Sequence, residues 1–249
     1  MRLLRVTAEG RVVRWAAFIS AAGGESRRGR VTLWSVDGSR GHDRVRRGYD
    51  AVAGKYADAY SGELAGKPLD RALLACLIEQ AGPGTPIADV GCGPGHVTEW
   101  IAGHGRAAVG IDLSAGMVAA ARRAYPGNEF REGDFLDLPA RDGEFGAVVA
   151  FYSIIHLAPG ELPPAFREIC RVLRAGGRVL VSFHVGSEVR HLEQWWGQAV
   201  DIDFRFLEVA DVAEVMERAG FSVEARLERA SYAGEVDTRR GYLLGRRRN

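Results

Sequence analysis

Apolar positions fall into two alternating patterns along most of the chain. Spacings of three and four residues predict helices over 43–60 and 68–82, the second beginning at Pro68 and ending at glycines. Further on, short continuous apolar runs, typical of buried strands, alternate with segments of helical spacing. The predicted strands are residues 86–91, 107–112, 128–134, 145–151 and 178–183, and the intervening helices begin near Gly95 or cover 114–124, 161–177 and 209–220. Two consecutive strands, 221–230 and 240–247, close the pattern.

This order of elements predicts an α/β fold. Strands that alternate with helices form a mostly parallel sheet with helices on both of its faces. We therefore expect a Rossmann-like, doubly wound sheet of seven strands. Because two strands follow each other directly at the end of the chain, the last one, over 240–247, is expected to lie antiparallel within the sheet.

Residues 1–42 differ from the remainder in charge. Residues 1–47 hold eleven arginines and four acidic residues, whereas the whole chain has a net charge of only +1. Only Lys55 and Lys67 are lysines, so the excess of arginine is typical of GC-biased coding and does not favour nucleic-acid binding. We predict a basic, loosely structured extension over 1–42, with a short hairpin at 30–38, followed by one domain over 43–249.

The composition fits one globular domain in a reducing compartment. The chain has 249 residues, of which 47% are hydrophobic, and no apolar run approaches the roughly 18 residues of a membrane span. Its three cysteines, Cys76, Cys92 and Cys170, are scattered without a CxxC pair, as expected for reduced thiols. We expect a cytoplasmic protein without a metal site, a disulfide framework or a membrane span.

The segment GCGPG, residues 91–95, places three glycines between a predicted strand and a predicted helix. Glycine at such a position lets the backbone adopt positive φ or lets a ligand approach closely. In doubly wound sheets, ligands bind beyond the carboxyl ends of the strands, where the next helix also offers unpaired N–H groups. The turn therefore predicts a cofactor site, either for the dinucleotide of a hydride transfer or for the S-adenosylmethionine of a methyl transfer.

Spacing and charge favour S-adenosylmethionine. A dinucleotide turn would have its third glycine at position 96, which is His96. Asp89 would repel a pyrophosphate but could receive the ammonium group of an amino acid. Asp112, at the end of the next strand, can accept both ribose hydroxyls, and Asp134, after the third strand, is placed for the adenine amine. One such aspartate is more often a turn residue, but three at successive strand ends favour this cofactor, with an NAD(P)-dependent oxidoreductase as the weaker alternative.

On these residues, the chain over 43–249 resembles the class I S-adenosylmethionine-dependent methyltransferases. ADVGCGPG, GIDLSAGMV, REGDFLDLP, FGAVVAFYSIIHL and VLRAGGRVLVSF are similar, in this order, to five motifs of that family. These motifs are specific for the cofactor and nearly silent about the methyl acceptor. The resemblance implies S-adenosylmethionine as cofactor and S-adenosylhomocysteine as product.

The resemblance also implies where the cofactor lies. The glycine turn would line the methionine end, Asp112 the ribose and Asp134 the adenine edge, while Phe151 would face the sulfonium. Tyr49 and Tyr56, seven residues apart on one helical face, would lie over the cofactor or, equally, form a packing stripe. The implied cofactor-binding residues are Tyr49, Tyr56, Asp89, Gly91, Cys92, Gly93, Gly95, Asp112, Leu113, Met117, Gly133, Asp134, Phe135 and Phe151.

Two residues after the fourth predicted strand are candidates for catalysis. Methyl transfer from a sulfonium mainly needs a positioned acceptor, and an oxygen or nitrogen acceptor can also need a base. His156 is the expected general base and Tyr152 the expected acceptor-binding residue, although both could instead pack within their loop. His96 and His104 are expected to be structural or exposed.

The segment over 184–206 is long for a connection and rich in aromatic residues. We expect it to wall an acceptor pocket, to form an amphipathic helix over the edge of the sheet, or to combine both. The aromatic candidates are Trp195, Trp196, Phe204 and Phe206, and the polar ones are His184, Arg190 and His191.

Missing motifs narrow the acceptor. The fourth strand is not followed by the Asn/Asp-Pro-Pro-aromatic motif of amino-methylating DNA enzymes, by a Pro-Cys nucleophile or by an acidic cluster for a metal. Basic residues interleaved with aromatics, as nucleic-acid binding requires, are also lacking in the domain. We expect a small organic acceptor, methylated on oxygen in preference to nitrogen, and leave the oligomeric state open. The alternative is a regulatory or assembly module that binds the cofactor without transferring its methyl group.

Overall fold

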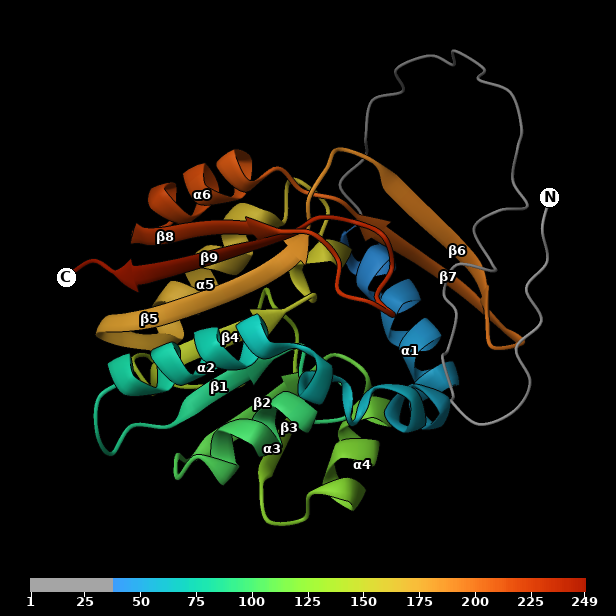
Figure 1. The fold of residues 1–249 in the computed structure, drawn as a ribbon, viewed down its shortest axis with the longest axis horizontal. Coiled ribbons are helices and arrows are strands. Elements are labelled where there is room, and N and C mark those ends of the chain that lie inside the picture. Colours follow the sequence, from blue (N-terminus) through green and yellow to red (C-terminus); the bar gives the residue numbers. More distant parts are fainter. Residues whose placement is uncertain (1–37) are drawn as a thin grey trace.

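The computed structural model describes residues 38–249 (Figure 1). The predicted basic extension and its hairpin lie outside the described residues as far as position 37. The first helix, α1 (Gly38–Tyr60), begins ahead of the domain boundary that we predicted at residue 43. Residues 38–42 therefore form the first turn of a helix that packs against α4 and β7 of the domain.

Seven strands form the main sheet, in the order β3-β2-β1-β4-β5-β9-β8. They are β1 (Ile87–Val90), β2 (Ala108–Asp112), β3 (Glu129–Glu132), β4 (Phe145–Phe151), β5 (Leu173–His184), β8 (Phe221–Arg229) and β9 (Arg240–Arg247). The first five pair in parallel, and β9 pairs antiparallel with both β5 and β8. The predicted doubly wound sheet, with its last strand inserted antiparallel, is confirmed.

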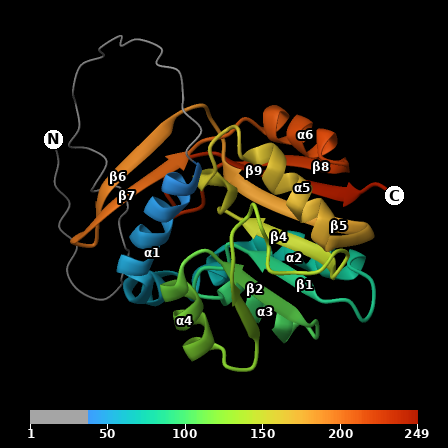
Figure 2. The ribbon, with the colours of Figure 1, turned by 180° about the vertical axis from the view of Figure 1, so that it is seen from behind.

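Helices cover both faces of this sheet, α2 and α3 on one and α5 and α6 on the other (Figures 1 and 2). Along β4, Ala147 and Val149 belong to the core under α2 and α3, whereas Val148 and Ala150 belong to the core under α5 and α6. A strand buried on both faces is apolar at every position, which explains the continuous run in the sequence. The helices are α2 (Pro68–Gln80), α3 (His96–Gly103), α4 (Ala115–Ala124), α5 (Leu162–Val172) and α6 (Val209–Arg218), with short 3-10 helices η2 (Glu63–Gly66) and η3 (Ile154–His156). Within residues 38–249, no helix combines the length and the apolar character needed to cross a membrane.

The helix predicted over 161–177 is shorter in the structure. α5 ends at Val172, and Leu173 already pairs with Phe145 as part of β5. Gly176 has a φ of +70°, which an α-helix does not accommodate. The prediction was wrong at this end because Leu173 is buried in either arrangement, so apolar spacing does not mark where the helix stops.

Residues 189–205 form a β-hairpin that stands apart from the main sheet. β6 (Val189–Trp195) and β7 (Gln198–Arg205) are joined by Trp196 and Gly197, whose φ values of +49° and +79° are typical of a type I′ turn. Figures 1 and 2 show the hairpin alongside α1, where Gly48 has no side chain and lets Ile202 pack closely. The alternative of an amphipathic helix in this segment is therefore wrong.

Candidate cofactor and acceptor site

The glycine turn lies between β1 and α3, where the order of the sheet reverses. Gly91, Gly93 and Gly95 have φ values of +75°, +52° and +85°. A Cβ on Gly91 would lie 2.2 Å from the Cβ of Ser153, and one on Gly95 would lie 2.8 Å from the ring of Phe130. The backbone conformation thus favours glycine at all three positions, and close packing adds to this at two of them.

A cavity of about 500 Å³ opens beyond the carboxyl ends of the central strands, a volume typical of small-molecule sites. Most of the predicted site residues line it, namely Tyr49, Tyr56, Asp89, Gly91, Cys92, Gly93, Asp112, Leu113, Gly133, Asp134, Phe135, Phe151, Tyr152 and His156. Gly95 and Met117 do not. Gly95 precedes α3 and packs against Phe130, and Met117 is buried in α4.

Two buried carboxylates line the cavity beside the turn. Asp89 accepts a hydrogen bond from the hydroxyl of Thr98 at 2.7 Å. Asp112 accepts hydrogen bonds from the backbone N–H groups of Gly93 and Ser114, both at 2.8 Å. Burial raises the pKa of Asp89 and of Asp112 to about 6, and the hydrogen bonds offset this only in part. A ligand that brings a positive charge or hydroxyl donors to this end would stabilise the ionised carboxylates.

Helix α1 lies along one side of the cavity and is held there by two polar contacts. Near its start, the ring of His42 pairs with the carboxylate of Asp134, and this hydrogen bond raises the pKa of His42. About two turns further on, the carboxylate of Asp50 accepts a hydrogen bond from the hydroxyl of Ser114 at 2.6 Å. The contact of His42 was missed from the sequence because we placed this residue in the N-terminal extension.

His156 is buried and paired on both ring nitrogens. Its Nε2 lies 2.8 Å from the hydroxyl of Tyr49, and its Nδ1 lies 3.0 Å from the carbonyl oxygen of Asp203 in β7. Because a carbonyl only accepts, Nδ1–H donates to Asp203 and Nε2 accepts from Tyr49. Burial lowers the pKa of His156 to about 4, so the imidazole is neutral at neutral pH. The pairing connects α1 to the hairpin through η3.

Tyr152 presents its ring to the cavity and points its hydroxyl away from it. The hydroxyl lies 3.2 Å from that of Tyr242, which in turn donates to the buried carboxylate of Asp70. The ammonium of Lys67 lies 5.0 Å from the centre of the Tyr152 ring, and the ring of His184 lies 5.3 Å from it. Tyr152 also has a φ of +53°, a strained conformation for a residue with a Cβ, and such strain gathers at functional sites.

The hairpin contributes part of the aromatic wall that we predicted. Trp195 and Phe204 line the cavity, and the rings of Tyr49 and Tyr56 meet that of Trp195 edge-on at 5.7 Å and 5.6 Å. Trp196 lies behind this wall, stacked on Trp195 at 5.1 Å. The aromatic residues therefore come from α1 and the hairpin together.

Of the three polar candidates in the hairpin segment, one lines the cavity and two do not. His184, at the end of β5, lines the cavity, and Phe206 stacks on its ring at 5.3 Å. Arg190 pairs with Glu188, and His191 pairs with Asp203 of the neighbouring strand. Neither Arg190 nor His191 lines the cavity, and as neighbours in β6 they point to opposite faces of the hairpin.

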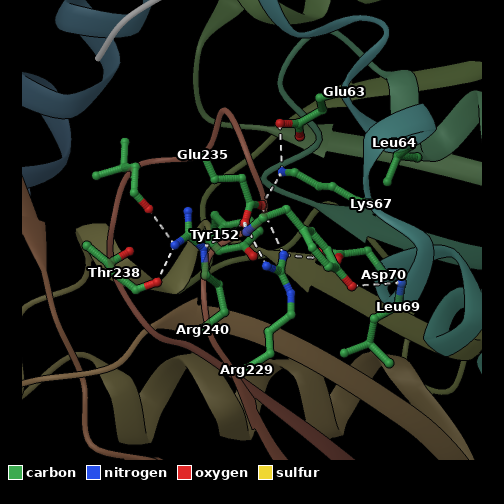
Figure 3. Close-up of polar contacts among 12 residues, drawn as sticks. Glu63, Leu64, Lys67, Leu69, Asp70, Tyr152, Arg229, Glu235, Thr238 and Arg240 are labelled. Atoms are coloured by element: carbon green, nitrogen blue, oxygen red, sulfur yellow. Dashed lines mark hydrogen bonds and ion pairs between the residues drawn. The ribbon is translucent and has the colours of Figure 1, made fainter. Parts of the chain in front are cut away.

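Another part of the cavity lining carries charged residues that the sequence did not single out (Figure 3). Lys67 donates to one oxygen of Glu63 at 2.8 Å, and Nε2 of His96 lies 3.0 Å from the other. Burial would raise the pKa of Glu63, but His96 and Lys67 together lower it to about 2. His96 was expected to be structural or exposed, yet it lines the cavity in this network.

Residues between β8 and β9 complete this part of the lining. Glu235 accepts two hydrogen bonds from Arg229, at 2.6 Å and 2.9 Å, and one from the N–H of Tyr232 at 2.7 Å. Arg240, at the start of β9, is only 4% exposed and lines the cavity beside Glu235. A hint was present in the sequence, because residues 230–239 are polar and irregular between two predicted strands.

Comparison with known proteins identifies the core of the chain. Residues 87–177 match the family described as a methyltransferase domain. A relative from Mycolicibacterium smegmatis, described as a probable S-adenosylmethionine-dependent methyltransferase, is 33% identical over 166 residues, which cover 64% of this chain and 61% of the relative. Residues 87–177 thus correspond to a methyltransferase domain, and the relative that matches a longer stretch of the chain is described as dependent on S-adenosylmethionine. The alignments span about half to three fifths of the length of the curated relatives that it matches.

Solved structures share the fold of this methyltransferase domain. The 1,6-didemethyltoxoflavin-N1-methyltransferase of Burkholderia thailandensis superimposes with a TM-score of 0.66 at 17% identity, covering 88% of this chain and 94% of that one. The cyclase SpnF superimposes with a TM-score of 0.65 at 22% identity, covering 83% and 97%. At these identities the likeness shows the fold alone, because one fold hosts many activities.

The cavity of the methyltransferase domain fits the cofactor of its class. Gly91 and Gly93 leave backbone at the turn without side chains, and the three aspartates reach the cavity from successive strand ends. Asp89 and Asp112 are buried carboxylates with raised pKa values, as expected of groups that await a cationic or hydroxyl-bearing ligand. Asp134 is also present at this end, although here its carboxylate is held by His42.

Proposed function

We propose that the chain is a methyltransferase that takes its methyl group from S-adenosylmethionine and transfers it to a small organic acceptor. The observation that carries this proposal is that one cavity is lined by two groups of residues. Gly91, Gly93 and the three aspartates form the first group, which we call the cofactor end, and Trp195, Phe204 and Tyr152 belong to the second, which we call the acceptor end. A cofactor and an acceptor bound in one cavity are held close to each other, which favours their reaction.

Bound S-adenosylmethionine supplies a methyl group on a sulfonium, which is a good leaving group. Asp112 would accept hydrogen bonds from the ribose hydroxyls, and Asp89 would receive the ammonium group of the methionine part. Asp134 would accept from the adenine amine, sharing its carboxylate with His42 or giving up that contact. Phe151, at the end of β4, would lie beside the reacting centre.

The pairing of His156 supports a positioning role better than that of a direct base. Its accepting nitrogen already receives the hydroxyl of Tyr49, and burial lowers its pKa to about 4. A group with such a pKa is a weak base at neutral pH. His156 would therefore hold the phenol of Tyr49 at the acceptor end. An oxygen acceptor remains favoured over a nitrogen acceptor in this proposal.

The alternative is a module that binds the cofactor without transferring its methyl group. One observation favours keeping it in view, since the cyclase SpnF has a similar fold and is not named as a methyltransferase. The dinucleotide alternative is disfavoured by the family match and by His96, which stands where a third glycine would be needed.

Calorimetric titration of the full chain with S-adenosylhomocysteine and, in parallel, with NADH tests the cofactor. We expect saturable binding of S-adenosylhomocysteine and none of NADH, and the reverse result would overturn the proposal. Release of S-adenosylhomocysteine from S-adenosylmethionine is then followed over a panel of small hydroxyl, carboxyl and amine compounds. Tight cofactor binding without turnover on any class of compound would favour the binding module instead.

A further inference from the structure

The acceptor end of the cavity has a cationic corner made of Lys67, Arg240 and the ring of His184. Figure 3 shows Lys67, just before α2, and Arg240, at the start of β9, both approaching Glu235. The Nζ of Lys67 lies 4.0 Å from one oxygen of Glu235, and the Nε of Arg240 lies 3.6 Å from the other. These three side chains and the Tyr152 ring face the same part of the cavity.

The carboxylates of this corner are already engaged by other groups. Both oxygens of Glu235 accept hydrogen bonds from Arg229, and one also accepts from the N–H of Tyr232. Glu63 is shared between Lys67 and His96. Neither carboxylate therefore fully satisfies the cations that line the cavity.

Arg240 is held in place by backbone carbonyls, and its Nε faces Glu235 at 3.6 Å, too far for a hydrogen bond. Its Nη1 donates to the carbonyl oxygens of Val236, at 2.6 Å, and of Thr238. Its Nε is buried and has no hydrogen-bond partner among residues 38–249. A buried guanidinium N–H without a partner is costly, so a ligand that supplies an acceptor oxygen would stabilise this arrangement.

The pKa of His184 reflects both the burial of its ring and the cations nearby. Burial, followed by the charges of Arg240 and Lys67, lowers the pKa of His184 to about 3. The imidazole is therefore neutral, and its Nδ1 is engaged by the hydroxyl of Thr238 at 2.8 Å. Burial accounts for most of this shift, but Arg240 and Lys67 also disfavour the protonated ring, as cations beside this part of the cavity would.

The nearby pair of His156 and Tyr49 is poorly suited to remove a proton. Burial lowers the pKa of His156 to about 4 and raises the pKa of Tyr49 far above neutral. An acceptor that is already ionised at neutral pH needs no base, whereas an alcohol or an ammonium does. Carboxylic acids are ionised in this way.

Building on the function proposed above, we propose that the acceptor is a carboxylic acid with an apolar body, bound as its carboxylate and converted to a methyl ester. One carboxylate oxygen is held by Arg240 and Lys67, and the apolar body lies against Trp195 and Phe204. The second oxygen attacks the methyl carbon and forms the new C–O bond while the C–S bond breaks. The bonding electron pair goes to sulfur, the sulfonium becomes a thioether, and no proton is transferred. The neutral ester no longer pairs with the cations and is released.

The test uses probes that share a body and differ in the polar group. Phenylacetate, indoleacetate and hexanoate are each compared with the alcohol and the amine of the same body, on the full chain saturated with S-adenosylhomocysteine. We expect at least one carboxylate to bind about tenfold more tightly than both of its partners, because a charge-assisted hydrogen bond distinguishes them. With S-adenosylmethionine, the same acid should give its methyl ester and one S-adenosylhomocysteine per ester. If no carboxylate is preferred over its partners, or the preferred acid is methylated elsewhere, the proposal is overturned.

Two variants with opposite expected signs separate recognition from a merely structural role. Lys67→Met should weaken binding of the preferred carboxylate about tenfold and leave its alcohol unaffected. Glu235→Gln removes a competing negative charge and should strengthen carboxylate binding by about threefold or more. Lys55→Met is the matched control, because Lys55 is the other lysine of the chain and donates to the carbonyl of Trp196 outside the cavity.

Affinity for S-adenosylhomocysteine is measured on every variant, so that two kinds of failure can be told apart. If the chain without substitutions does not bind S-adenosylhomocysteine, the proposed function itself is refuted. Normal cofactor binding without a preference for carboxylates would refute only the inference about the acceptor. If Lys67→Met weakens S-adenosylhomocysteine binding and leaves the carboxylate unaffected, the corner serves the methionine carboxylate of the cofactor, and the inference is again overturned.

Discussion

The two ends of the cavity are assembled in different ways. The cofactor end consists of the glycine turn and strand ends within residues 89–135, each at or just beyond the carboxyl end of a parallel strand. The acceptor end brings together α1, the segment before α2, the hairpin β6–β7 and the loop between β8 and β9. The residues proposed to bind the cofactor are thus placed by local order along the sheet, whereas those proposed for the acceptor meet only once the chain is folded.

The two ends also differ in charge. The cofactor end holds Asp89 and Asp112, whose pKa values burial raises to about 6. At the acceptor end, burial and the charges of Arg240 and Lys67 lower the pKa of His184 to about 3. Carboxylates thus line the first end and cations line the second, an arrangement that suits the proposed sulfonium-bearing cofactor and an ionised acceptor.

The largest effect is expected from Gly91→Ala, which would disable the cofactor end alone. Alanine at a φ of +75° is strained, and its Cβ would lie 2.2 Å from that of Ser153. We expect affinity for S-adenosylhomocysteine to fall by at least about 100-fold and the free energy of unfolding to fall by about 2–5 kcal/mol. Calorimetric titration and denaturant unfolding measure the two effects.

Two controls accompany Gly91→Ala. Gly103→Ala lies in α3 with open space around the added methyl group, and should change neither quantity much. Combining Gly91→Ala with Ser153→Gly removes the clash but keeps the strained φ, so partial recovery is expected. Unchanged cofactor affinity in Gly91→Ala would contradict the placement of the cofactor at this turn.

Asp112→Asn should weaken cofactor binding less than Gly91→Ala does. Unlike Gly91→Ala, it should not lower the free energy of unfolding. The variant keeps the size of the side chain but loses charge-assisted hydrogen bonds to the ribose, so binding of S-adenosylhomocysteine should weaken by about 1–3 kcal/mol. The protein without ligand should be as stable or more stable, because burial penalises the ionised carboxylate. Asp58→Asn, on the exposed side of α1, is the matched control. Equal affinity in both variants would show that the ribose assignment is wrong.

Acidification should move stability and cofactor affinity in opposite directions. Asp89 and Asp112 have folded-state pKa values of about 6 against 3.8 for an ordinary aspartate. Between these values the folded state binds protons that the unfolded state has lost, so these two groups make the unliganded protein more stable as pH falls. The ligand needs the ionised carboxylates, so its affinity should fall over the same range.

Thermal unfolding and titration calorimetry over about pH 5 to 8 follow the two slopes, and proton release on binding near pH 6 should approach about one per complex. Asp89→Asn should reduce the pH dependence of both the stability and the cofactor affinity. Parallel slopes, or an affinity independent of pH, would contradict the proposed role of these carboxylates.

Much of the cofactor end could be predicted from the sequence. Gly91, Gly93 and the three aspartates do line the cavity, because the carboxyl ends of parallel strands meet at one edge of a sheet. Met117 and Gly95 were expected to touch the cofactor, but neither lines the cavity: Gly95 packs against Phe130, and Met117 is buried in α4. Sequence order locates a segment but does not decide which side chain of that segment faces the cavity.

The acceptor end could be predicted only in part. Trp195 and Phe204 were expected there, but the two-residue turn at Trp196 and Gly197 was not recognised, so a helix stayed open as an alternative. Lys67 and Arg240 lie on segments far apart in the chain and look like ordinary surface cations in the sequence. Their role follows from tertiary contacts with Glu235, which no local pattern encodes.

The smallest effect is expected for variants of His156, and it depends on whether the Nε2 of this residue acts as a base. From the sequence, an unperturbed histidine with a pKa near 6.5 would be a suitable base, and His156→Ala would then lower kcat about 100-fold with cofactor affinity intact. The structure gives a buried imidazole that accepts from Tyr49, donates to the carbonyl of Asp203 and has a pKa lowered to about 4.

Imidazole NMR, with signals assigned through single His→Gln variants, should show His156 neutral down to about pH 5. His42, whose pKa the bond to Asp134 raises, should titrate above the ordinary histidine value in the same spectra and serves as the internal control. Once an acceptor is known, Tyr49→Phe and His156→Gln should each lower turnover by less than about tenfold, because positioning and not proton removal is lost. A His156 midpoint close to 6.5, or a far larger loss of turnover in His156→Gln than in Tyr49→Phe, would restore the general base and weaken the case for an acceptor that is already ionised.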